Sequence, residues 1–251
     1  MYQLLAIDAG NTRIKWAVFT VQGDILQCGI LEHGGEQPTP ACWHECSHAV
    51  VANVAGASSY EALLQRLELL AIPVNWLTPD VQAPGLVNGY EDKKQLGIDR
   101  WAAMVAAWQH YQKSCVVVNA GTALTVDLIE QTGQGQGRFI GGIIVPGLRL
   151  MQSSLGLATA NIGEPPGEWQ DFPLNTGDAV YSGALNAMSG AVDNMLQRLS
   201  EHCGQVVSCI VSGGDAELLL PFLQRHALAR EHKLEENLVL RGLWHLERDA
   251  S

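Results

Sequence analysis

The sequence predicts an α/β fold made of two similar halves, each with its own sheet, that face each other across a cleft. A buried strand, a polar turn and an alternating strand occur near residues 3–20 and again near 115–129. The first turn, Asp8 to Asn11, aligns with Asn119 to Thr122, about a hundred residues further on. Strand patterns then alternate with helical patterns in both halves. Chance similarity between two hairpins is the alternative, but each copy stands at the head of a half, which favours duplication.

Composition excludes several classes of protein. The chain has 251 residues, 47% of them apolar, and 26 acidic against 15 basic side chains give a net charge of −11. That charge repels phosphate backbones, so nucleic-acid binding is not expected as the main task. No apolar run reaches the ~18 residues of a membrane span. The start of the chain shows no secretion signal, and the six cysteines have no framework spacing, so we expect free thiols and a cytoplasmic protein.

The first half reads as four strands, a helix and a fifth strand. The strands lie near residues 3–8, 14–20, 23–31 and 48–56, the helix near 58–71 and the last strand near 74–78. Leucines recur on one face of the predicted helix, and a serine precedes it as a cap. A connection containing glycine and proline follows, and a helix of small and aromatic residues begins near Arg100.

Residues 42–48 carry two cysteines and two histidines in alternation. On a strand all four would share one face, whereas zinc ligands usually come as two separated pairs. We therefore interpret this stretch as an ordinary edge strand, with a metal site as the alternative.

The second half begins with the repeated hairpin at 114–130. A second hairpin has a glycine-rich tip near 132–137, which no helix follows, so we interpret it as a turn and not as a nucleotide loop. A strand then breaks at Pro146-Gly147 into a helix, a long helix spans 176–203, and a strand, Gly213-Gly214 and a helix complete the pattern.

Three buried strands therefore end in polar glycine turns, at residues 8–12, 119–122 and 212–215. Glycine turns let main-chain N–H groups point toward a ligand, and short polar side chains with Lys15 add donors, which suits a polyphosphate. A carboxylate at Asp8 would repel phosphate unless Mg²⁺ lies between them, as phosphoryl transfer requires. Neither GxxxxGK[ST] nor GxGxxG is present, which disfavours the P-loop and dinucleotide folds. Ordinary structural turns are the alternative.

The stretch NGYEDKKQLGIDRW, residues 88–101, supplies candidates for an acceptor site. Asp99, just before a helix, is either a capping carboxylate or a base that orients an attacking hydroxyl. Arg100 would pair with an anionic group of the substrate. The residues alone leave both interpretations of Asp99 open.

Taken together, these motifs resemble the type III pantothenate kinases, members of the actin, sugar kinase and Hsp70 superfamily. The resemblance covers nearly the whole chain and depends on DAGNTRIK, NGYEDKKQLGIDRW, NAGTALTVD, GGIIVPG, the threonine of NTGDAVYSG, and VSGGDAE. It implies two duplicated ribonuclease-H-like α/β lobes around a nucleotide cleft. We place the N-terminal lobe, with the first phosphate turn and the substrate segment, at residues 1–112. The C-terminal lobe, with the second phosphate turn, the adenosine side and the dimer interface, is residues 113–251.

The resemblance also implies a reaction, the ATP-dependent phosphorylation of pantothenate that begins coenzyme A synthesis, and a set of roles. Asp99 would accept the proton of the pantothenate hydroxyl, and Asp8 would lie near Mg²⁺. The family is homodimeric and depends on K⁺ or NH₄⁺. Residues implied to bind ATP are Asp8, Ala9, Gly10, Asn11, Thr12, Arg13, Ile14, Lys15 and Thr122. Residues implied to line the pantothenate pocket are Tyr90, Gly97, Ile98, Asp99, Arg100 and Thr176.

The sequence departs from the family at Asn119, where relatives commonly have an aspartate associated with the monovalent cation. An amide oxygen can still bind K⁺ but carries no charge, so we expect weaker cation binding. Two alternatives remain: a nucleotide-binding regulator without activity, which would have little use for Asp99, and a kinase or phosphatase acting on a sugar or polyphosphate, which residues 88–100 disfavour.

Overall fold

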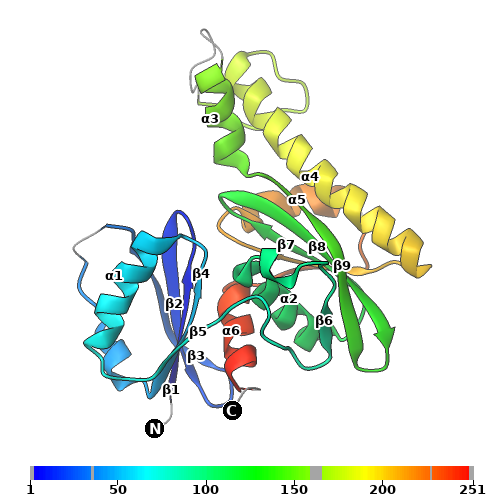
Figure 1. Cartoon of the computed structure of the whole chain (residues 1–251). Helices are drawn as coiled ribbons and strands as arrows, with labels where there is room; N and C mark the ends of the chain where they lie inside the picture. Colours follow the sequence, from blue (N-terminus) through cyan, green and yellow to red (C-terminus); the bar gives the residue numbers. More distant parts are fainter. Residues whose placement is uncertain (1–2, 35–36, 159–165, 227, 249–251) are drawn as a thin grey trace. The chain divides into compact units, whose positions relative to one another are not determined.

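The structure is a computed structural model that describes residues 3–34, 37–158, 166–226 and 228–248. It divides into two compact units. The first unit takes its described residues from 1–112, 133–139 and 237–251, and the second from 113–132 and 140–236. Figure 1 labels the elements along the chain.

The first unit is built on a five-stranded sheet of order β3-β2-β1-β4-β5. Its central strand β1 pairs antiparallel with β2 and parallel with β4. The predicted strands of the first half are confirmed: β1 Gln3–Ala9, β2 Arg13–Thr20, β3 Ile25–Glu32, β4 His48–Asn53 and β5 Val74–Trp76.

Each face of this sheet packs against helices, as strand alternation requires. Leu5, Ile7 and Ala9 face a core that includes Leu63 and Leu67 of α1 (Ala57–Glu68). Leu4, Ala6 and Asp8 therefore lie on the opposite face, where α6 (Leu238–Arg248) packs on β1, β2 and β4.

On that face α6 packs closely against α2 (Ile98–Tyr111). A Cβ atom on Gly242 of α6 would collide with the main chain of Ala102 in α2. The two helix backbones therefore lie so close together at this point that only glycine fits. Trp244 of α6 stacks near Phe19 and donates from Nε1 to the Thr20 carbonyl at 3.2 Å. No pattern in the sequence indicated that the last helix would pack beside the first strands.

The second sheet has the order β11-β10-β7-β8-β9-β6. When β6 at the edge is left out and the sheet is read from β9, the order β9-β8-β7-β10-β11 repeats the β3-β2-β1-β4-β5 order of the first sheet. As in the first sheet, the central strand, β7, pairs antiparallel with β8 and parallel with β10. This repeat confirms the predicted duplicated α/β fold. The strands are β6 Leu86–Asn88, β7 Cys115–Ala120, β8 Ala123–Gly133, β9 Gln136–Pro146, β10 Ser208–Ser212 and β11 His232–Leu234.

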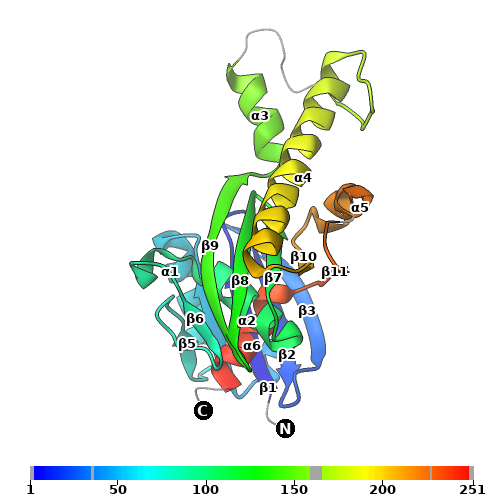
Figure 2. The ribbon, with the colours of Figure 1, turned by 90° about the vertical axis from the view of Figure 1, so that its right-hand side faces the viewer.

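Three helices complete the second unit: α3 (Leu148–Ala158), α4 (Thr176–Cys203) and α5 (Ala216–His226). Asn175 caps α4 by accepting from the Asp178 N–H at 2.9 Å, and Gly204 ends it in the left-handed region at φ 65°. In Figures 1 and 2, α3 and the first turns of α4 extend beyond the edge of their sheet. Among the described helices, none combines the length and the hydropathy that crossing a bilayer would take.

The interpretation of residues 42–48 as an edge strand was wrong. Ala41–Glu45 form a 3₁₀ helix, η1, in which Cys42 is buried and His44 exposed, so the four side chains do not share one face. Burial of Cys42, Trp43 and Cys46 against the α1 side of the sheet explains the helix, because the adjacent side chains of Cys42 and Trp43 cannot both face one core from a strand. Within the described residues, no group of three or more His, Cys, Asp or Glu side chains could hold a metal.

Candidate active site

Asp8 lies at the end of β1, on the face of the sheet that α6 covers. Its Oδ1 atom is buried and has no hydrogen-bond partner among the described residues. A buried carboxylate oxygen without a donor is costly unless a cation or a ligand satisfies it. The Asp8 position therefore fits a bound cation.

Two charged groups act on Asp8. Burial and, to a lesser extent, the negative charge of Asp99 raise the pKa of Asp8 to about 7, while Lys15 opposes both effects. Lys15 stands directly opposite Asp8 in the β1–β2 register, so both side chains leave the same face of the sheet. The β1–β2 hairpin and the start of α2 thus bring one cation and a second carboxylate of the first unit within electrostatic reach of Asp8.

Asp99 lies in the first turn of α2 and is half-buried. Burial raises its pKa, while the neighbouring Arg100 N–H and guanidinium lower it in part. Gly97 precedes the helix, and a Cβ there would collide with Asp99 Oδ1. Gly97 therefore leaves room for the Asp99 carboxylate in this position.

Arg100 is buried beside two aromatic rings. Its Nη1 donates to the Tyr90 hydroxyl at 3.1 Å, and its Cζ lies 5.8 Å from the centre of the Tyr90 ring and 6.0 Å from that of Phe139. The Tyr90 and Phe139 rings are 5.1 Å apart. Cation–π contacts of this kind hold a guanidinium in place. Its N–H groups that are not used in the contact can then bind a planar anion such as a carboxylate.

The segment before Tyr90 is held by close packing. Asn88 Oδ1 accepts from the Tyr90 N–H at 3.0 Å. A Cβ on Gly89 would collide with the Phe139 carbonyl, so only glycine lets this segment approach β9. These contacts explain why NGY occurs as a unit.

In the second unit the other two glycine turns lie together. The Asp215 N–H donates to the Ala120 carbonyl at 3.0 Å. Gly213 has φ +106°, and a Cβ there would collide with the Ala120 backbone. The ends of β7 and β10, which run parallel, therefore carry the turns at 119–122 and 212–215 side by side.

The VPG motif packs on the second turn. The Gly147 N–H donates to the Thr122 carbonyl at 3.0 Å, and a Cβ on Gly147 would collide with the Gly121 carbonyl. The GGIIVPG strand thus ends at the main chain of residues 121–122. Asn119, one residue before Ala120, is half-buried in the same place.

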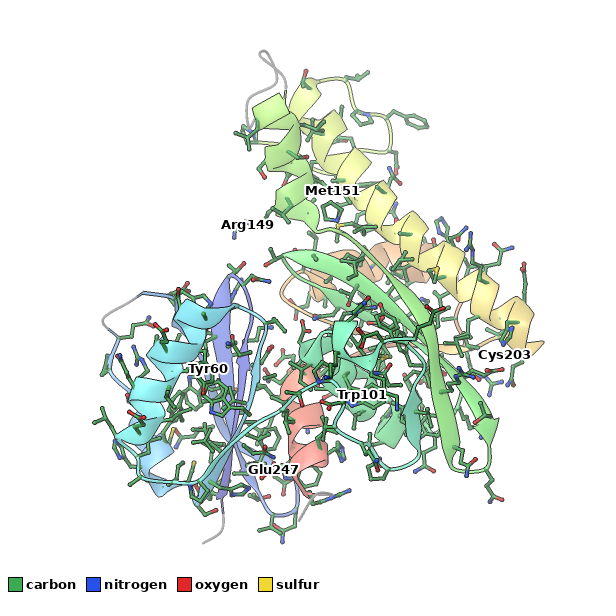
Figure 3. All side chains as sticks on the ribbon, in the orientation of Figure 1. Tyr60, Trp101, Arg149, Met151, Cys203 and Glu247 are labelled. Atoms are coloured by element: carbon green, nitrogen blue, oxygen red, sulfur yellow. The ribbon has the colours of Figure 1, made fainter. Side chains whose placement is uncertain are left out.

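Thr176, predicted to line the substrate pocket, is the first residue of α4 and borders a cavity of about 810 Å³ between α3 and α4. Met151, labelled in Figure 3, comes from α3. The lining is mostly apolar or small: Met151, Ser154, Leu155, Pro173, Leu174, Asn175, Thr176, Ala179, Val180, Gly183, Ala184 and Ala187.

The first unit therefore brings together Asp8, Lys15, Asp99, Arg100 and Tyr90. Thr122, Asn119 and Thr176 belong to the second unit. Phe139, whose ring and carbonyl both shape the Arg100 site, was not predicted from sequence. Its only sequence signal is its place beside the GGIIVPG stretch, because spacing does not reveal a contact between residues 90 and 139.

These features define a class: an α/β protein of two duplicated sheets that carries the glycine turns and carboxylates of a phosphotransferase. Solved structures share the fold. A Baf family protein from Campylobacter jejuni is 20% identical with TM-score 0.58, and 98% of each chain is covered. Component A of (R)-2-hydroxyglutaryl-CoA dehydratase from Acidaminococcus fermentans is 12% identical with TM-score 0.52 over the whole of both chains.

The sequence profile of the type III pantothenate kinases matches residues 4–198. The type III pantothenate kinase of Methylobacillus flagellatus is 58% identical over 246 residues, covering 98% of each chain. That of Nitrosospira multiformis is 39% identical over 251 residues, covering 99% of this chain and 92% of its own. This chain belongs to the type III pantothenate kinase family.

Proposed function

We propose that this chain transfers the γ-phosphoryl group of ATP to the hydroxyl of pantothenate, the first step of coenzyme A synthesis. Family membership supports the reaction. The observation that carries the assignment of residues is the charge coupling of Asp8 and Asp99 within the first unit. One carboxylate belongs to the proposed phosphate turn and the other to the proposed acceptor segment.

Residues 8–15 form the proposed grip on the ATP phosphates. Asp8 would hold Mg²⁺ through its buried Oδ1 atom, together with phosphate oxygens. A single carboxylate is ordinary for Mg²⁺ in a kinase, because the phosphates and water complete its shell. When bound, the ion neutralises the charge that develops on the phosphoryl oxygens. Lys15, beside Asp8, would add a positive charge directed at the same phosphates.

Asp99 is the proposed base. Its raised pKa makes it a better proton acceptor than an exposed aspartate, provided that it is ionised when the acceptor binds. The phosphoryl transition state is loose, so Asp99 acts chiefly by orienting the hydroxyl and accepts the proton late. The absence of a side chain on Gly97 leaves room for that carboxylate.

The pantothenate pocket is proposed around Arg100. Its guanidinium, held beside the Tyr90 and Phe139 rings, would pair with the pantothenate carboxylate, because Arg forms bidentate pairs with that group. Gly97, Ile98 and Thr176 would complete the pocket. In the second unit Thr122 would contact ATP, and Asn119 would offer an amide oxygen to K⁺ or NH₄⁺.

Homodimerisation and a cytoplasmic location are part of the proposal. The family resemblance suggests the dimer, and exposed apolar side chains in α3 and in the segment before α4 support it: Leu157 is 88%, Phe172 88% and Leu174 97% exposed. The division into a substrate lobe at 1–112 and a second phosphate lobe at 113–251 remains a prediction from sequence.

A coupled assay of ADP formation tests the function. With ATP, Mg²⁺ and K⁺ or NH₄⁺, turnover should depend on added pantothenate, and Asp99→Asn should lower kcat by about 10²–10⁴-fold. The matched control is Asp24→Asn, at an exposed turn of the same unit. ATP binding without pantothenate-dependent turnover would instead support a nucleotide-binding regulator.

A further inference from the structure

His33 contacts the proposed phosphate turn from outside the motif. Its Nε2 atom lies 2.7 Å from the Gly10 carbonyl oxygen, across 23 residues of chain. The β2–β3 register pairs Arg13 with Glu32, so the residue after β3 arrives beside the turn. The contact is partly buried, and no sequence motif indicated it.

The bond has a defined direction. A carbonyl oxygen only accepts, so His33 Nε2 must carry the proton and donate. In a trans peptide the C=O and the following N–H point in opposite directions within one plane. A donor on the Gly10 carbonyl therefore determines the direction of the Asn11 N–H, which points away from His33.

Gly10 makes this restraint useful. Glycine has no side chain to limit its backbone, so the Gly10–Asn11 peptide has more orientations to lose than others. Asn11 and Thr12 are both exposed. A side chain that fixes this peptide before ATP binds reduces the conformational entropy lost on binding.

We propose that His33 is a positioning residue for ATP binding: by holding the Gly10 carbonyl, it keeps the Asn11 N–H directed at the ATP phosphates. This inference rests on the proposed role of residues 8–15. The alternative is that His33 only ties the end of β3 to the turn, which would affect folding and not nucleotide affinity.

The test compares His33→Ala with His33→Gln, whose side-chain amide keeps a donor at similar reach. Loss of the bond should raise the ATP KM and the Kd of a non-hydrolysable ATP analogue, measured by calorimetry, by about five- to tenfold. The pantothenate KM should stay within about twofold, and His33→Gln should recover most of the affinity. His44→Ala, an exposed histidine of the same unit, is the matched control and should leave both constants unchanged.

Asp8→Asn separates the inference from the proposal on which it rests. If Asp8→Asn weakens binding of the Mg²⁺–nucleotide complex and His33→Ala does not, His33 is not a positioning residue and the phosphate turn stands. If neither variant alters nucleotide binding, both assignments are wrong. A lower Tm for His33→Ala with unchanged affinity, or weakened affinity that His33→Gln does not restore, would also overturn the inference.

Discussion

Asp99, in the first turn of α2, raises the pKa of Asp8, at the end of β1, by the effect of its negative charge. The two residues are 91 positions apart in the sequence. Two carboxylates that repel each other are expected where a cation and a phosphate normally bind, because ligand binding then relieves the repulsion. Proteins often carry such unfavourable charge at functional sites at some cost in stability.

Asp8→Asn should therefore stabilise the ligand-free protein at pH 8 by about 1–2 kcal/mol, because it removes a buried charge that Asp99 repels and whose Oδ1 atom has no hydrogen-bond donor among the described residues. The pKa of Asp8 is raised from 3.8 to about 7, so between those pH values the folded chain binds a proton that the unfolded chain does not. The contribution of Asp8 to stability is thus greatest below about pH 4 and falls as the pH rises through 7. Denaturant unfolding of both proteins from pH 5 to 8 should show the advantage of the variant growing with pH. A pH-independent difference would contradict this account.

Asn119→Asp should raise the affinity for the monovalent cation, because a charged carboxylate replaces the neutral amide that is the proposed ligand. Turnover titrated with K⁺ in both proteins should give a lower half-saturating concentration for the variant. Equal values in both proteins would show that residue 119 does not bind the cation.

Gly242→Ala should destabilise the protein by about 1–3 kcal/mol, because a Cβ on α6 would meet the Ala102 backbone of α2 and neither helix can yield easily. The matched control is Gly190→Ala, in the interior of α4, where a Cβ meets nothing within 4 Å. That change should raise stability by up to about 1 kcal/mol through helix propensity. Thermal and denaturant unfolding of both variants measure the contrast, and a similar effect at the two sites would contradict the close packing of α2 and α6.

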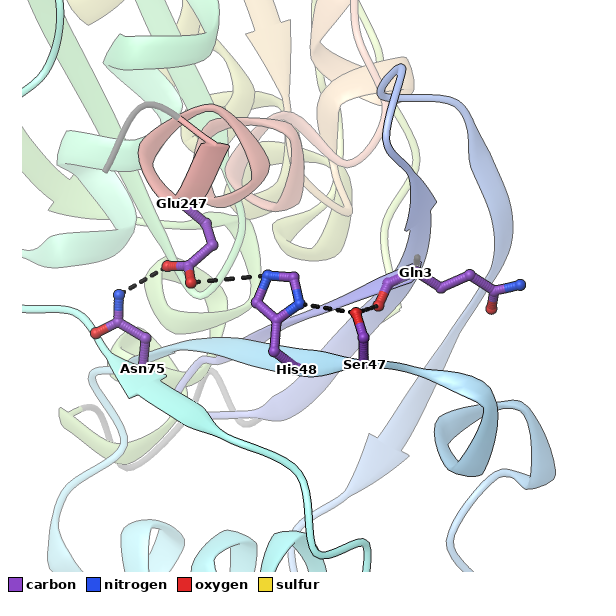
Figure 4. Close-up of polar contacts among 5 residues, drawn as sticks. All are labelled: Gln3, Ser47, His48, Asn75 and Glu247. Carbon is purple, nitrogen blue, oxygen red and sulfur yellow. Dashed lines mark hydrogen bonds and ion pairs between the residues drawn. The ribbon is translucent and has the colours of Figure 1, made fainter. Parts of the chain in front are cut away.

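His48 should make stability depend on pH. Its Nδ1 atom lies 3.1 Å from Ser47 Oγ, and its Nε2 atom lies 3.7 Å from Glu247 of α6. Glu247 also accepts from Asn75 at 2.7 Å, and Figure 4 draws these contacts. Burial lowers the pKa of His48, and Glu247 opposes this only in part. The unfolded chain therefore binds a proton at His48 more readily than the folded chain does. The contribution of neutral, buried His48 to the free energy of unfolding is complete above pH 6.5 and is lost as the pH falls below that value.

Denaturant unfolding of wild type and His48→Asn from pH 7.5 to 5.5 measures this effect. The difference in free energy of unfolding between wild type and His48→Asn should become smaller as the pH falls. A difference that grew toward pH 5.5 would show that the attraction of Glu247 outweighs burial.

Leu174→Glu should disrupt the proposed homodimer, because it places a charge among the exposed apolar side chains at the α3–α4 cavity. Sedimentation velocity should show a monomer for this variant. Leu69→Glu changes another exposed leucine, at 80% exposure in the first unit, and should leave the dimer intact. A wild-type protein that sediments as a monomer at micromolar concentration would refute the dimer itself.

Local patterns predicted much of this fold. The two hairpins, the strands around them and the helices α1, α2, α4 and α5 all follow from alternation, helical periodicity and glycine turns. Residues 41–45 were misassigned, because an alternating run of Cys and His does not reveal that a nearby Trp43 is buried. The short strands β6 and β11 have three residues each, too few for a periodic signal.

The sequence by itself determined the repeated hairpin at the head of each half, the glycine turns and the family, because each depends on residues that lie close together in the chain. Only the tertiary structure decided that Asp8 shares its face of the sheet with α6 and lies within reach of Asp99, that Phe139 flanks Arg100, and that Gly242 meets Ala102. The physical reason is that side-chain alternation assigns a residue to one of two faces, whereas the packing of distant segments decides what covers that face.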